Sequence, residues 1–394
     1  MLGATVPRPP VSRGEPAADD PFGAGPFAWA PHRLPRWLAS HRVALAALVA
    51  WVPLALLSAI EGLALGPTRH QSMLLDFAAY GRYLVAGPAF VYAGTWILPQ
   101  LTRVVRQFLD ADIVADHDRH RYEALVASTY RLIMTRWIDV VILAGSFGLA
   151  VTTTSRHYPE SVPSWVTPDG GARSLAGWWR MVVSQSLFHV MQGIWSWRLF
   201  LWVRFLYKTS RLDMNLVASH PDRMGGLRFV LVPLRGFSIL AFGIGAIVAG
   251  SIAESVLIDG KPLHDYRYLI GLQVLAVLVL FAGPTLFLMG PLIRLQEWGT
   301  FHYGRLAADV GHAFQQRWLL QGRRAGSDAL ELPDFSATTD LYSVAANVRD
   351  INPFVLNPRI VVTLTVATLI PYVPLLFAVL PVEELFGYAM KAFV

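Results

Sequence analysis

The stretch GFSILAFGIGAIVAGSIAESVLI, residues Gly236–Ile258, decides the fold class, because it holds a single charged residue, Glu254. A helix needs about 20 apolar residues to cross a hydrocarbon layer of about 30 Å. No water in that layer can hydrogen-bond an exposed backbone, so a helix is the form that such a stretch takes. The stretch therefore predicts a transmembrane helix.

Six further stretches share this apolar character, and together the seven predict an all-α polytopic membrane helix bundle. The chain of 394 residues is 54% hydrophobic and 15% charged, against about 25% charged in a soluble globular domain. We therefore expect about seven transmembrane helices. The other six lie near Val43–Leu65, Tyr83–Leu101, Trp137–Thr154, Trp178–Tyr207, Tyr268–Ile293 and Ile360–Leu380.

The basic residues predict how this bundle is oriented. Lys and Arg are about three times as numerous in the segments on the side of the N-terminus as in those on the other side, and cytoplasmic loops carry such an excess. The rule does not use hydrophobicity, so it is independent of the criterion that defined the spans. It places the N-terminus in the cytoplasm and the C-terminus in the periplasm.

The chain divides into a tail and the bundle. Residues 1–42 are rich in Pro, Gly and Ala, which predicts a disordered cytoplasmic tail, and residues 43–394 form the bundle. The helical pattern of three spans continues past the membrane, through Thr102–Asp110, Lys208–Leu216 and Gln296–Leu320. Extended cytoplasmic helices are therefore expected within 102–136, 208–235 and 294–359.

One face of the fourth span is polar. Gln185, His189, Gln192 and Ser196 are spaced so that they fall on one stripe of a helix. The stripe has two interpretations, namely the wall of a pore or proton relay in which His189 titrates, or hydrogen bonds that hold neighbouring helices together. The second is the more common use of such residues.

Ionisable residues also gather near the outer ends of three spans. Glu61 closes the first span, Arg82 opens the second, and Glu254 follows Ala241, Gly245, Ala249 and Ala253, a ladder of small residues that allows close helix packing. These three, with His189 deeper in the membrane, predict an outward-facing polar cavity. The alternative is that the two acids reach the interface or pair structurally.

The segment His220–Gly226 is the most motif-like part of the expected cytoplasmic side. Pro221 disfavours a helical residue before it, and the paired Gly225 and Gly226 allow the chain to reverse. A structured turn is the simpler interpretation. The other is a site for an anion or an anionic lipid headgroup, formed by His220, Asp222, Arg223 and Arg228.

Prolines interrupt the last two spans. Each removes a helical hydrogen bond and opens a kink. Broken helices form binding sites in transporters, yet prolines are also common in membrane helices, and the sequence leaves both open. The residues are Pro284, Pro291, Pro371 and Pro374.

Several kinds of chemistry find no support. The chain has no cysteine, which excludes disulfides and thiolate sites. It contains no phosphate-binding loop, nucleophile elbow or zinc-protease helix. Asp116–His120 has metal-ligand residue types, but a solvated helix break is the better interpretation of one short charged turn. We therefore expect no catalytic residue, metal, cofactor or nucleic-acid partner.

Short segments along most of the chain after residue 40 resemble an uncharacterised family of multi-pass bacterial inner-membrane proteins. The resemblance implies a polytopic protein of the bacterial inner membrane and no particular reaction. The segments that carry it are WVPL at Trp51 through AIEG at Gly62, LDF at Leu75–Phe77, VRQF at Val105–Phe108, SRLD at Ser210–Asp213, HPDR at His220–Arg223 with GGL at Gly225–Leu227, and PLL at Pro374 through PVEE at Glu384.

Two functions remain open from the sequence. The polar stripe, the outer acids and the broken helices favour a conduit or carrier for an ion or small solute. The long, charged cytoplasmic segments favour a non-enzymatic sensor or assembly scaffold. The lipid bilayer is the expected partner in either case, and a protein partner is expected for the second.

Overall fold

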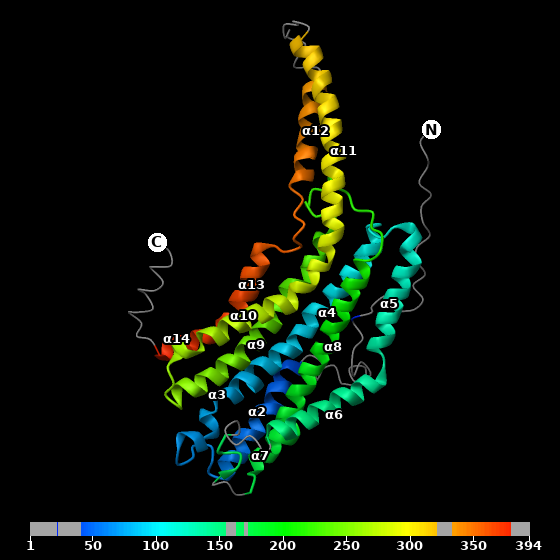
Figure 1. Ribbon diagram of the computed structural model, residues 1–394. Helices are drawn as coiled ribbons and strands as arrows, with labels where there is room; N and C mark the ends of the chain where they lie inside the picture. Colours follow the sequence, from blue (N-terminus) through cyan, green and yellow to red (C-terminus); the bar gives the residue numbers. More distant parts are fainter. Residues whose placement is uncertain (1–21, 23–40, 155–162, 169–171, 321–332, 380–394) are drawn as a thin grey trace.

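A computed structural model shows the protein as a bundle of helices (Figure 1). It describes residues 22, 41–154, 163–168, 172–320 and 333–379. The expected tail, residues 1–42, lies almost entirely outside these ranges, as does the end of the chain. Phe22 is described, and its buried ring packs edge-on against Trp202 and Phe205.

The described part of the chain is almost wholly helical. Apart from short helical turns, its elements are α2 (Arg42–Ile60), α3 (Phe77–Ala79), η3 (Tyr80–Ala86), α4 (Gly87–Asp110), α5 (Arg119–Ile133), α6 (Arg136–Thr153), α7 (Leu175–Trp179), η7 (Arg180–Gln185), α8 (Ser186–Thr209), η8 (Leu227–Leu231), α9 (Val232–Leu257), α10 (Arg267–Phe281), η10 (Gly283–Leu288), α11 (Met289–Gln315), α12 (Pro333–Arg349), α13 (Pro358–Leu369), η13 (Ile370–Tyr372) and α14 (Val373–Val379).

Six helices in the described ranges are long and apolar enough to cross a membrane, so the prediction of an all-α membrane bundle is confirmed. The fourth expected span is not among them. It forms the continuous helix of α7, η7 and α8, but its polar stripe and Arg198 lower its hydropathy. The six run over Arg42–Ile60, Phe77–Asp110, Arg136–Thr153, Leu227–Leu257, Leu263–Phe281 and Pro358–Val379.

Large apolar side chains on the outside of the bundle fit this assignment. Such residues cover the outer faces of α6 and α10 at exposed fractions that a soluble surface rarely tolerates. They include Trp137 at 60%, Val140 at 64%, Leu272 at 63% and Val279 at 63%. A hydrocarbon environment removes the cost of exposing them.

Helix α9 lies at the centre of the packing, against α13 on one side and α3, η3 and α4 on the other. Helix α13 packs against α9 at the predicted ladder of small residues. A Cβ atom at Gly245 would lie 2.2 Å from the carbonyl oxygen of Thr368, and one at Gly250 would lie 2.6 Å from that of Phe77. Backbones at this separation admit only glycine.

Two of the predicted proline breaks are present, and the residue after each of these prolines makes a tertiary hydrogen bond. Pro284 lies in the 3₁₀ segment η10, where the Thr285 hydroxyl donates to the carbonyl of Val355 at 2.8 Å. Pro371 lies in η13, and the hydroxyl of Tyr372, the last residue of η13, donates to Gln273. Tertiary hydrogen bonds therefore stabilise both breaks.

The expected extended helices are found in part. Helix α11 continues through a π-helical turn to Leu320, and Figure 1 shows it beside α12 as a hairpin that projects beyond the bundle. By contrast, α8 ends at Thr209, so the expected helix through Leu216 is wrong. Pro221 and the left-handed backbone of Gly225 and Gly226 require a loop there.

Candidate functional site

Two π-helical segments face each other inside the bundle. They are η3 (Tyr80–Ala86) and η7 (Arg180–Gln185). The Tyr83 hydroxyl donates to Oε1 of Gln185 at 2.5 Å and so joins them. π-helical turns are rare in proteins overall, but those that occur are often found at functional sites. The extra residue in such a turn moves side chains out of the regular helical register.

The polar stripe of the fourth helix forms one hydrogen-bonded chain. Nε2 of Gln185 lies 2.9 Å from Nε2 of His189, and Nδ1 of His189 lies 2.9 Å from Oε1 of Gln192. Because an amide NH₂ only donates and an amide oxygen only accepts, this pattern assigns His189 a proton on Nδ1. Tyr83, Gln185, His189 and Gln192 thus form a continuous relay of partners across two helices.

Arg180 lies at one end of this chain and is almost completely buried, with 4% of its surface exposed. Its guanidinium interacts with the Tyr83 hydroxyl and lies within electrostatic range of the carboxylates of Asp76 and Glu254. Its Nε and Nη1 atoms have no hydrogen-bond partner among the described residues. A buried guanidinium with unpartnered nitrogens is costly, which marks Arg180 as a candidate functional residue.

Trp165 closes the cluster at the end of the bundle where α7 begins. Its buried indole Nε1 donates to Oδ2 of Asp76 at 3.0 Å, and its ring centre lies 5.6 Å from the guanidinium carbon of Arg180. The hydroxyl of Ser174 donates to the carbonyl of Trp165 at 2.9 Å. Trp165 is therefore held over Asp76 and Arg180 as a cap.

The predicted site residues are brought together only in part. Arg82 lies within electrostatic range of both Glu254 and His189. Glu61 does not join them. Its carboxylate instead accepts from the backbone N–H groups of Leu175 and Ala176, at 2.9 and 3.4 Å, and so caps the start of α7.

Three residues at the centre of this cluster were missed by the sequence reasoning, namely Asp76, Tyr83 and Arg180. Arg180 lies two residues after Trp178, the expected start of the fourth span, and was counted with the basic residues of the outer side. The sequence held no signal for this position, because the π-helical turn that directs Arg180 inward is irregular helix geometry.

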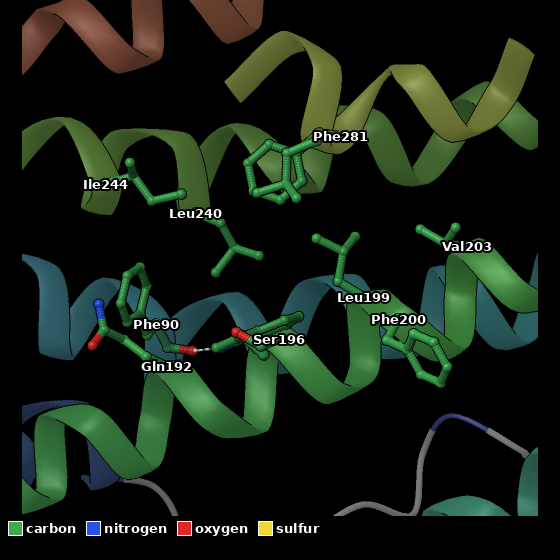
Figure 2. Close-up of a pocket in the computed structure, with 11 residues that line it drawn as sticks. Phe90, Gln192, Ser196, Leu199, Phe200, Val203, Leu240, Ile244 and Phe281 are labelled. Carbon is green, nitrogen blue, oxygen red and sulfur yellow. Dashed lines mark hydrogen bonds between the residues drawn. The ribbon is translucent and has the colours of Figure 1, made fainter. Parts of the chain in front are cut away.

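A cavity of about 370 Å³ lies beside Gln192, the last residue of this hydrogen-bonded relay. It is bounded by α4, α8, α9 and α10. Figure 2 shows Gln192 and Ser196 on its wall, among Phe90, Leu199 and Phe281. The remaining lining residues are also apolar or aromatic. The cavity is therefore mainly hydrocarbon, with a polar edge where the relay from His189 ends.

The predicted turn at His220–Gly226 is formed around Asp222. Its Oδ1 accepts from the backbone N–H groups of Met224 at 2.8 Å and Gly226 at 3.1 Å, and its Oδ2 accepts from that of Arg228 at 3.1 Å. Nδ1 of His220 lies 2.8 Å from the same carboxylate. Burial opposes the charge, yet these partners outweigh it and hold the pKa of Asp222 below its ordinary value.

A third cluster of polar residues, His117, Asp118 and Asp213, links two loops at the same end of the bundle. The backbone N–H of Asp213 donates to Asp118 at 2.9 Å, which lowers the pKa of the Asp118 carboxyl, and His117 lies 3.0 Å from the Asp213 carboxylate. Ligand atoms of these three residues lie within 4.8 Å of one another, so they could hold a metal ion. Their mutual hydrogen bonds already account for the arrangement.

Comparison with known proteins adds no relative. No family model, no curated protein and no solved structure matches the chain.

Proposed function

We propose that the protein is a seven-span conduit or carrier for an ion or small solute, with the cluster around Arg180 as its binding site. The observation that supports this most is the burial of Arg180 with two guanidinium nitrogens unpartnered in the described structure. Such groups are expensive in a bilayer unless a solute or water meets them. The proposal includes a bacterial inner membrane, a cytoplasmic N-terminus and a periplasmic C-terminus.

The arrangement gives each part a task. Trp165 closes the site toward the expected outer face, and Tyr83 and Gln185 link it to His189. The relay ends at Gln192, on the wall of the cavity in Figure 2. A solute that enters from the outer face when Trp165 moves aside would therefore meet Arg180 first and the relay second.

Flux in proteoliposomes tests this function. Protons, K⁺, chloride and acetate are each made the permeant species, and flux is recorded between pH 5 and 8. Arg180→Gln is expected to slow the transported species about tenfold, the equivalent of one charge-assisted hydrogen bond. His189→Ala and Glu254→Gln are expected to change the pH dependence of that flux.

Glu297→Gln is the matched control, because Glu297 is exposed on α11 and lies outside the cluster. It should transport like the parent protein. Parental flux in all three cluster variants would leave the relay as a packing device and would contradict the proposal.

A sensor or scaffold is the second candidate, and the projecting hairpin favours it. Trp298 and Phe301 on α11 are 52% and 78% exposed on an element that leaves the bundle (Figure 1). Purified full-length protein is expected to bring down a specific partner that Phe301→Asp loses and Asp309→Asn, on the same helix, retains. If no partner depends on the hairpin, this candidate fails.

A further inference from the structure

A second cavity, of about 350 Å³, lies where α9 and α13 begin. The turn around Asp222 forms one wall, and the linker between α12 and α13 forms the other. Unlike the cavity in Figure 2, it is lined largely by charged and amide side chains. They are Asp222, Arg223, Arg228, Asp350, Asn352 and Asn357.

The position of this cavity relative to the membrane follows from the two helices. The apolar spans of α9 and α13 begin at Leu227 and Pro358, and both residues adjoin or line the cavity. These two helices pack closely against each other. The cavity therefore lies at the level where hydrocarbon gives way to headgroups, on the side expected to face the cytoplasm.

The charges in the cavity are not equally available. Asp222 is occupied by three backbone amides. Arg223 pairs with Asp350 at 3.4 Å, and both side chains are 56% exposed. The exposed Arg228 guanidinium has no hydrogen bond or ion pair with any described residue. In this cavity, therefore, the guanidinium of Arg228 is available to a ligand, and the Asp350 carboxylate is held only by an exposed ion pair.

Met224, Leu231 and Leu356 complete the lining with apolar surface. A ligand that suits this combination has a phosphate for Arg228, an amine for Asp350 and an apolar portion. The cavity carries two arginines and two aspartates, so a ligand without net charge fits it better than an anion does.

We propose that this cavity binds the headgroup of an aminophospholipid, with its phosphate on Arg228 and its ammonium on Asp350. The site is separate from the cluster around Arg180 and does not depend on transport. Soluble phosphoethanolamine shares the chemistry of the headgroup, so the source of the ligand is decided by experiment.

Native mass spectrometry of the full-length protein in mild detergent provides the test. Dioleoyl phosphatidylethanolamine and dioleoyl phosphatidylglycerol are added separately, and the bound fraction is measured. Arg228→Ala is expected to reduce retention of both lipids about fivefold, the effect of one basic residue at a membrane surface. Asp350→Asn is expected to reduce retention of phosphatidylethanolamine and to increase that of phosphatidylglycerol.

Arg305→Ala, which removes an equal charge from the exposed hairpin helix α11, should retain lipid like the parent protein. Competition by phosphoethanolamine at equal concentration would assign the site to a soluble phosphate ester and overturn the lipid assignment. Parental retention by Arg228→Ala, or equal loss in Arg305→Ala, would overturn the site itself.

Discussion

Replacement of Asp222 by Ala is expected to destabilise the protein by about 3 kcal/mol, because one carboxylate satisfies three backbone amides. Hydrogen bonds to a charged group contribute about 1.5–3 kcal/mol each, but bonds that share an acceptor are not additive. Thermal melting in detergent measures the loss as a fall in Tm.

The backbone of this turn makes the loss larger than a simple cap would. Arg223, Gly225 and Gly226 have φ angles of 56°, 62° and 98°, all in the left-handed region. For Arg223 this conformation is unfavourable by about 1–2 kcal/mol. The Asp222 carboxylate holds the backbone N–H of Met224, which directly follows Arg223, so the strained conformation depends on that carboxylate.

Asp222→Asn, which keeps one acceptor oxygen, should lose about half as much stability. Asp350→Ala should lose less than about 1 kcal/mol, because its ion pair with Arg223 is exposed. If Asp222→Ala melts at the parental temperature, the turn does not depend on its carboxylate.

Acid should reproduce the effect of this mutation. The pKa of Asp222 is lower in the folded protein than its ordinary value. Its contribution is therefore complete above the unfolded pKa of about 3.9 and disappears as the pH falls through the folded pKa. The parent protein should accordingly lose more Tm than Asp222→Ala as the pH is lowered below about 4.

Gly245→Ala is expected to cost about 2–3 kcal/mol and to lower Tm in detergent. The added Cβ would lie 2.2 Å from the carbonyl oxygen of Thr368, an impossible contact with backbone. Helices α9 and α13 would have to separate, and overpacking of this kind costs about 1–3 kcal/mol or more.

The same glycine-to-alanine change at Gly148 is expected to stabilise the protein. Gly148 lies inside α6, and a Cβ there meets nothing within 4 Å. Alanine should stabilise this helix by about 0.5–1 kcal/mol, since it loses less backbone entropy than glycine on folding. Equal melting of the two variants would show that α9 and α13 are not packed as described.

Sequence patterns predicted those features that depend on local composition. Apolar length predicted the membrane bundle, the small-residue ladder predicted a close helix contact at Gly245, and the residue types of His220–Gly226 predicted a capped turn. Helical spacing also placed His189 and Gln192 on one face, where they are bonded to each other.

Features that depend on distant contacts or on irregular helix geometry could not be read in the same way. Glu61 was grouped with Arg82 by depth in the membrane, but local capping of α7 determines where its carboxylate goes. Asp213 approaches Asp118 only because the two loops meet in space. The regular helical period assumed for the fourth span gave no reason to place Arg180 inside the bundle.

The two π-helical segments have a consequence for how the cluster can move. A π-helical turn and an α-helical turn differ by one residue in the hydrogen-bond register. A segment such as η7 can therefore migrate along its helix by exchanging one i→i+5 bond for one i→i+4 bond at a time. Each exchange rotates the residue it passes by about 100°. Arg180 and Gln185 can thus change the direction in which they point while the helix that carries them stays intact.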